Sequence, residues 1–139
     1  MNIKQDLITD LKTNAKKAYS RAYAPYSHFN VGAALITETG QVFTGCNVEN
    51  ASYGLTQCAE RSAICSAIAQ GHIKFQTIVI YTEQSKLTPP CGACRQVIAE
   101  FFTADSMVVS CNHLGDSREW SVKELLPQAF TPMDLIEKD

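Results

Sequence analysis

Three of the six cysteines lie near the starts of two predicted helices, and this placement constrains the fold more than any other feature of the sequence. Cys58 precedes a helical pattern that ends near Gly71, and Cys91 and Cys94 begin a second pattern that ends near Phe102. Because a helical turn takes about 3.6 residues, the C-x-x-C spacing directs both sulfurs toward one point. Helix starts also stabilise thiolates, since they carry free N–H groups and partial positive charge.

Three converging thiolates form a tripod that suits zinc, a tetrahedral metal, with the fourth position open for water. Zinc with three thiolates carries a net charge of about −1, which opposes deprotonation of that water. We expect Arg61, Arg95 or both to offset this charge by donating hydrogen bonds to the sulfurs. Glu60 follows Cys58 by two residues and is expected to accept the proton of the water without being a ligand.

The spacing alone does not separate this interpretation from simpler ones. A lone C-x-x-C is also found in redox proteins and in structural zinc sites, and a structural site usually needs four protein ligands. The other cysteines, Cys46, Cys65 and Cys111, have no matching spacing. We expect these three to be buried or chemically inert thiols, because cysteine is commonly a small core residue.

Hydrophobic periodicity predicts a three-layer α/β/α sandwich with a mixed central sheet of about five strands. The first helix starts near Ile3, with Asn2 and Gln5 as a cap, continues to about Ala22 and ends before Pro25. The remaining predicted elements are strands at 30–37 and 41–48, a helix at 57–71, a strand at 77–82, a helix at 91–102, a strand at 106–110 and a short helix at 122–126. The first two strands read as an antiparallel hairpin, and the later alternation predicts parallel strands. The length predicts one domain over residues 1–139.

Composition narrows the function classes further. A net charge of −2 offers no electrostatic footprint for nucleic acid or an anionic membrane. No apolar run approaches the ~18 residues that span a bilayer. Lys4, Asp6 and Asp10 interrupt the N-terminal apolar pattern, so a secretory signal is not expected. We therefore expect a cytoplasmic protein, where spaced cysteines more often bind metal or take part in chemistry than form disulfides.

Several motifs of this chain match those of a known enzyme family. Cys58-Ala59-Glu60 followed by the PCGAC segment at 90–94 matches the zinc signature of nucleobase deaminases, in its three-cysteine form. Cysteine ahead of Ala-Glu is less similar to the branches that act on deoxycytidylate and polynucleotides, which use histidine there. The similarity extends to FNVGAA at 29–34, NVENASYG at 47–54, CAER at 58–61, PCGACRQ at 90–96 and LLPQAF at 125–130. Together these motifs resemble the small homotetrameric zinc-dependent cytidine deaminases.

The resemblance implies a role for each matched residue. Cys58, Cys91 and Cys94 match the zinc ligands, and Glu60 matches the proton shuttle. The substrate positions are Phe29 beside the base, Asn47 and Glu49 on the ribose 3′-hydroxyl, the backbone of Ala59 on the pyrimidine edge, and Ala51, Tyr53 and Phe130 reaching a neighbouring subunit's nucleoside. Without the resemblance, Asn47 and Glu49 are equally well explained as turn or edge residues, although strand alternation places both on one side. Phe29 and Phe130 are otherwise most simply core residues.

The activity implied by the resemblance is hydrolytic deamination of cytidine and 2′-deoxycytidine to uridine and 2′-deoxyuridine, with release of ammonia, in pyrimidine salvage. In this scheme zinc-bound hydroxide attacks C4 of the base, and Glu60 shuttles the protons. The implied cofactor is one Zn²⁺ per subunit, the partner is a small nucleoside rather than nucleic acid, and the active sites are completed across the interfaces of a homotetramer.

Two other functions stay open at this point. Another deaminase with the same zinc motif, such as a blasticidin S deaminase, is the nearest alternative, although the FNVG segment at 29–32 and the Ala129-Phe130 tail favour cytidine. A non-catalytic structural zinc or redox C-x-x-C protein is the alternative from a different class. Glu60 beside Cys58 and the open fourth coordination position both argue against this second alternative.

Overall fold

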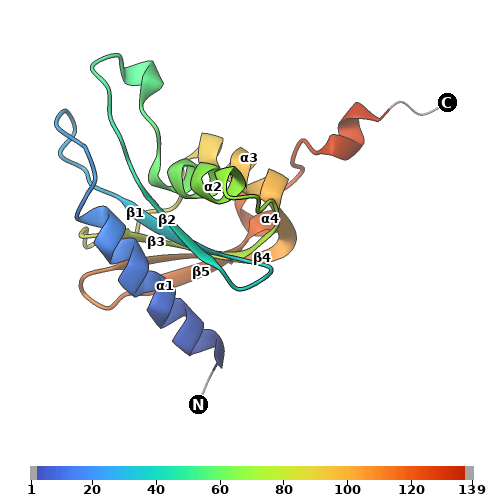
Figure 1. The fold of residues 1–139 in the computed structure, drawn as a ribbon, viewed down its shortest axis with the longest axis horizontal. Helices are drawn as coiled ribbons and strands as arrows, with labels where there is room; N and C mark the ends of the chain where they lie inside the picture. The colour runs from blue at the N-terminus through green and yellow to red at the C-terminus, as the bar shows by residue number, and fades with distance from the viewer. Residues whose placement is uncertain (1–2, 137–139) are drawn as a thin grey trace.

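The computed structural model describes residues 3–136 and has a single mixed sheet covered by helices on both faces (Figure 1). The elements in chain order are α1 (Ile3–Tyr19), β1 (Gly32–Thr37), β2 (Val42–Cys46), η1 (Tyr53–Leu55), α2 (Ala59–Ala69), β3 (Phe75–Thr82), α3 (Gly92–Phe101), β4 (Phe102–Asn112), β5 (Ser117–Ser121), α4 (Val122–Leu125) and η2 (Pro132–Leu135). The strands run in the order β2-β1-β3-β4-β5. Only β3 and β4 are parallel, and α3 connects them; the other neighbours are antiparallel.

Each face of the sheet has its own apolar core. On one face, Leu11 and Ala15 of α1 pack against Val79 and Tyr81 of β3. On the other face, side chains of α2, α3 and α4 pack against the alternate residues of β3, among them Ile80. Figure 1 shows α1 alone on the first face and the other three α-helices on the second. The predicted three-layer α/β/α sandwich with a mixed five-stranded sheet is confirmed.

Two glycines allow these helices to lie unusually close to the sheet. A Cβ atom on Gly32 would come within 2.0 Å of the carbonyl oxygen of Ala15 in α1. A Cβ atom on Gly45 would come within 2.3 Å of the backbone nitrogen of Ala63 in α2. Any larger residue would push the helix away, so Gly45 helps to fix α2, at whose start Cys58 lies.

Several predicted boundaries were wrong. Helix α1 ends at Tyr19 rather than near Ala22, because the chain turns before Pro25. Strand β4 begins at Phe102, directly after α3, and not at 106, since Phe102 pairs with Phe75 of β3 before the register shifts. Asn2, half of the expected cap, lies outside the described residues. Within residues 3–136, no helix has both the length and the apolar character needed to cross a membrane.

Candidate metal centre and active site

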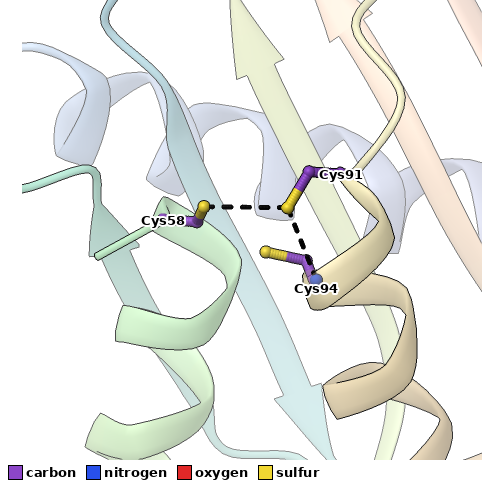
Figure 2. Close-up of side chains that lie close together, drawn as sticks. All are labelled: Cys58, Cys91 and Cys94. Atoms are coloured by element: carbon purple, nitrogen blue, oxygen red, sulfur yellow. Dashed lines mark hydrogen bonds between the residues drawn. The ribbon is translucent and has the colours of Figure 1, made fainter. Parts of the chain in front are cut away.

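The three predicted cysteine ligands converge at the starts of α2 and α3. The Sγ atoms of Cys58, Cys91 and Cys94 all lie within 4.8 Å of one another, and those of Cys58 and Cys91 are 3.9 Å apart. Figure 2 shows the three side chains directed toward a common point between the two helices. Within the described part of the chain, this is the one His, Cys, Asp and Glu cluster with metal-binding geometry.

The local backbone explains why the sulfurs meet. Cys58 is the N-cap of α2 and Cys91 is the N-cap of α3, both with extended backbone conformation. The Sγ of Cys91 accepts a hydrogen bond of 3.5 Å from the backbone N–H of Cys94, so this thiol also caps its helix (Figure 2). The C-x-x-C spacing then places Cys94 one turn further, on the buried side of α3.

The surroundings favour a thiolate at the first of these positions. The pKa of Cys58 is lowered to about 5, chiefly by the hydrogen bond that this thiol shares with Cys94 and also by the nearby Arg61. The same bond, together with burial, raises the pKa of Cys94. Nη2 of Arg61 donates to the Sγ of Cys58 over 3.2 Å, whereas its buried Nε has no partner among the described residues. A sulfur tripod with one nearby cation suits a divalent soft metal.

Glu60 lies in the first turn of α2 and is only 5% exposed. Burial raises the pKa of this carboxyl to about 7, although its own backbone N–H, by donating to it, acts in the opposite direction. A carboxyl group that changes protonation near neutral pH can both accept and return a proton. This carboxyl lies beside the sulfur cluster, since Cys58 and Cys94 both act on its pKa.

A cavity of about 330 Å³ opens beside the cluster, and it has a size suited to a small ligand. Its walls come from four parts of the chain: the segment before β1, the end of β2, the start of α2 and the segment before α3. The lining residues are Ser27, Phe29, Val31, Asn47, Glu49, Thr56, Cys58, Ala59, Glu60, Thr88, Pro89 and Cys91. The structure therefore brings Phe29, Asn47, Glu49 and Ala59 to the same cavity as Glu60 and two of the three cysteines.

The side chains of Asn47 and Glu49 form hydrogen bonds with the backbone of residues 26–31, which forms one wall of this cavity. Asn47 accepts from the N–H of Val31 over 2.9 Å and donates from Nδ2 to the carbonyl of Phe29 over 2.7 Å. Oε1 of Glu49 accepts from the N–H groups of Tyr26 and Ser27, and its Oε2 accepts from the Ser27 hydroxyl. These bonds lower the pKa of Glu49, chiefly the bond from the Ser27 hydroxyl, so the group is held as a carboxylate.

Three of the expected substrate residues lie outside this cavity. Tyr53 borders an adjoining cavity of about 410 Å³ together with Tyr26, and their ring centroids are 6.0 Å apart. Ala51 is exposed on the loop that leads to Tyr53. Phe130 is 58% exposed and lies between α4 and η2. Figure 1 shows the chain leaving the body of the molecule after α4.

Arg95 differs from Arg61 in what it contacts. Its Nε donates to the carbonyl of Pro90 over 2.8 Å and its Nη1 donates to the carbonyl of Leu125 over 3.1 Å. Of the two arginines, Arg61 alone has a hydrogen bond to sulfur among the described residues. The expectation for Arg95 is therefore corrected: its hydrogen bonds go to backbone carbonyls and tie α3 to α4 and to the segment before Cys91.

Five lining residues had no role predicted from the sequence: Ser27, Val31, Thr56, Thr88 and Pro89. Val31 lies within the motif at 29–34, Ser27 lies two residues before it, and Thr88-Pro89 directly precede the motif at 90–96, so proximity in the sequence was an available signal. Nothing in the local pattern marks Thr56 as a cavity residue, because its role depends on how the loop before α2 folds back.

Comparison with known proteins agrees with this site. The family model for the cytidine and deoxycytidylate deaminase zinc-binding region matches residues 6–111. A cytidine deaminase of Halalkalibacterium halodurans is 50% identical over 121 residues, which cover 87% of this chain and 92% of that protein. A cytidine deaminase of Mycobacterium tuberculosis is 41% identical over 128 residues, which cover 90% of each.

Solved structures give the same result. The cytidine deaminase of Burkholderia pseudomallei superposes with a TM-score of 0.85 at 52% identity, covering 88% of this chain and 98% of that one. The cytidine deaminase of Mycobacterium tuberculosis superposes with a TM-score of 0.78 at 36% identity, covering 93% of this chain and 98% of that one. The cluster of Cys58, Cys91 and Cys94 fits the zinc-binding region that the family model describes, so the metal of this site is Zn²⁺. The chain belongs to the family of cytidine and deoxycytidylate deaminases that share this zinc-binding region.

Proposed function

We propose that this protein is a cytidine deaminase, which hydrolyses cytidine and 2′-deoxycytidine to uridine and 2′-deoxyuridine and releases ammonia. The observation that carries this proposal is a buried carboxyl, Glu60, next to three converging thiols in a cavity of about 330 Å³. A structural zinc site would need neither a cavity nor a buried acid beside its ligands. Relatives that cover most of the chain bear the same name.

Zn²⁺ held by Cys58, Cys91 and Cys94 would lower the pKa of a coordinated water toward neutrality. Glu60 takes a proton from the water that attacks C4 of the base and delivers it to ring N3, which makes C4 more electrophilic. Glu60 then transfers the second proton to the departing amino group, and ammonia leaves. Arg61 donates to the Sγ of Cys58 and so offsets part of the negative charge of the thiolates.

The remaining cavity residues position the nucleoside in this proposal. Phe29 packs beside the base, and the backbone N–H of Ala59 bonds the pyrimidine edge. Ala59 is the first residue of α2, and N–H groups at this position have no partner within the helix. Asn47 and Glu49 bind the ribose 3′-hydroxyl, and their existing bonds to the Tyr26–Val31 backbone fix both side chains before substrate arrives.

The charge of the cavity favours a nucleoside over a nucleotide or a polynucleotide. No Lys or Arg is among the described residues that line it, and Glu49 adds a negative charge. A phosphate would be repelled there, and a polynucleotide would be expected to need a basic channel with stacking aromatics. The overall charge of −2 supports the same preference.

We also propose that residues 1–139 form one catalytic domain of a cytoplasmic homotetramer. Tyr53 and Phe130 are 74% and 58% exposed, which leaves both rings accessible to a neighbouring copy. In the tetramer, Ala51, Tyr53 and Phe130 would each contribute to the nucleoside site of a neighbouring copy. The cavity that Tyr53 borders adjoins the one that holds Glu60, since Ser27, Glu49 and Thr56 line both.

Ultraviolet absorbance tests the substrate directly, because deamination changes the spectrum of the base. The zinc-loaded protein is assayed with cytidine, 2′-deoxycytidine, deoxycytidylate and blasticidin S at equal concentrations. We expect turnover of both nucleosides and little turnover of the other two compounds. Preferred turnover of blasticidin S or deoxycytidylate would contradict the proposal and would indicate a different deaminase.

A further inference from the structure

The segment 83–90, which joins β3 to α3, carries part of the candidate active site. Thr88 and Pro89 line the cavity beside Glu60, and the segment ends directly before Cys91. It contains no helix or strand, and within the described chain none of the loop and turn backbone–backbone hydrogen bonds involves it. Its protein contacts come instead from side chains that donate hydrogen bonds to its backbone carbonyls.

Asn112 supplies two of these donors. This last residue of β4 is fully buried, and its Nδ2 donates to the carbonyls of Gln84 over 2.9 Å and Ser85 over 3.3 Å. Its Oδ1 accepts from the N–H groups of Leu114 and Asp116, each over 3.0 Å. One amide group thus joins the start of the segment to the turn between β4 and β5.

Ser110 supplies a third donor, closer to the active site. It is also fully buried, and its hydroxyl donates to the carbonyl of Thr88 over 2.7 Å. The hydroxyl of Thr88 lies 3.3 Å from that of Thr82 in β3. A fourth carbonyl of the segment, that of Pro90, accepts from Nε of Arg95.

The pairing of β3 and β4 brings the side chains of Thr82, Ser110 and Asn112 to one face of the sheet. In the parallel pairing of β3 and β4, Ile80 is opposite Ser110 and Thr82 is opposite Asn112. By strand alternation these four residues share the face of the sheet on which Val108 packs in the core of α2 and α3. Apolar side chains are expected on this buried face of the sheet. A buried hydroxyl or amide there destabilises the fold unless it is hydrogen-bonded. The need for donors to the segment 83–90 explains the change from apolar to polar side chains.

We propose that Ser110 and Asn112 are positioning residues for the reaction. By holding the carbonyls of Thr88, Gln84 and Ser85, they fix the cavity wall and the approach of the chain to Cys91. They touch neither the metal nor the substrate, and they act through the segment between them and the site. This proposal rests on the proposed function for its kinetic consequences only, because its effect on the metal centre is independent of substrate.

The metal centre is tested by the rate at which the zinc-loaded protein releases zinc to an excess of a coloured chelator. The variants are Ser110→Ala, which removes the hydroxyl that donates to Thr88, and Asn112→Asp, which replaces the amide NH₂ that donates to Gln84 and Ser85. Ser106→Ala is the matched control, because Ser106 is a buried serine of the same strand whose hydroxyl serves Thr103, remote from the segment. We expect release to be on the order of tenfold faster in the two variants, as for other groups that orient metal ligands, and unchanged in the control.

Steady-state kinetics then separate positioning from general stability. We expect Ser110→Ala to raise KM for cytidine more than it lowers kcat, because Thr88 and Pro89 form the cavity wall. Ser106→Ala should lose similar stability in urea unfolding and keep its KM. If Asn112→Asp does not fold, Ser110→Ala alone decides the question. If Ser110→Ala releases zinc at the rate of the control and has the same KM as the control, the proposal is overturned. Absence of cytidine turnover in the unmodified protein would overturn the proposed function instead, and the zinc-release test would still be valid.

Discussion

The guanidinium of Arg61 donates a hydrogen bond to the thiol sulfur of Cys58 over 3.2 Å, on the first turn of the helix that also carries Glu60. This contact raises the pKa of Arg61 and helps to lower that of Cys58. The positively charged guanidinium of Arg61 therefore lies next to the three cysteines that would bind zinc as thiolates. The balance of charge at the site depends on this pair.

Replacement of Arg61 by glutamine should weaken the metal site. Without the guanidinium, the thiolate charge is less balanced and the zinc-bound water is harder to deprotonate. We expect about a 10–100-fold loss of zinc affinity or of kcat/KM. Competition with a fluorescent zinc chelator measures the affinity. Arg118→Gln removes the same charge from an exposed position on β5 and should leave the affinity unchanged; equal affinities in both variants would refute the role of Arg61.

Replacement of Glu60 by glutamine should abolish most activity and retain the fold. The amide has nearly the same shape but cannot carry protons between water, N3 and the leaving group. We expect kcat to fall by about 10²–10⁴-fold, with zinc content unchanged. Glu100→Gln, on the exposed side of α3, serves as the control. A Glu60→Gln protein with near-normal turnover would remove Glu60 from the mechanism.

The bond between Ser27 and Glu49 should make stability depend on pH. The bond lowers the pKa of Glu49 in the folded protein below its ordinary value of 4.5. Its stabilising effect is therefore present above about pH 4.5 and is lost as the pH falls through the lower pKa of the folded state.

We expect Ser27→Ala to lower the free energy of unfolding relative to the unmodified protein near neutral pH, with a smaller difference near pH 3. Urea unfolding at both pH values measures the two differences. The same comparison in a Glu49→Gln background should show no pH dependence of the Ser27 effect. A difference that stays constant from neutral to acid pH would contradict the assignment of this bond.

Phe130 should act on the site of another subunit. Phe130→Ala alone and Glu60→Gln alone are each expected to reduce activity strongly. When the two variants are unfolded together and refolded, mixed assemblies would contain sites with an intact Glu60 from one chain and an intact Phe130 from another. Recovery of activity above that of either variant is the expected result. A mixture with only the sum of the two activities would place both residues in the same subunit's site, or Phe130 in none.

The parts of this molecule that the sequence predicted are those with a local signature. The positions of Cys58, Cys91 and Cys94 at helix starts follow from motif spacing, and the five-stranded mixed sheet follows from hydrophobic periodicity. The contacts of Arg95 with Pro90 and Leu125 had no such signature, because they depend on where α3 lies relative to α4.

The polar end of β4 is a second example of what the sequence could not reveal. Ser110 and Asn112 follow an apolar strand and, as isolated residues, indicate only that the strand is ending. Their role is visible only once the parallel pairing of β3 and β4 brings them under the segment 83–90. Long-range pairing of this kind leaves no periodic pattern in the sequence.

Metal removal tests the central claim most directly. The protein is dialysed against a chelator that binds zinc tightly, its zinc content is measured, and turnover of cytidine is followed by ultraviolet absorbance as Zn²⁺ is added back. We predict that activity is lost with the metal and returns in proportion to zinc, reaching its maximum near one Zn²⁺ per chain, with one ammonia released per uridine formed. Full turnover by the zinc-free protein, or no turnover by a protein with one Zn²⁺ per chain, would contradict the account.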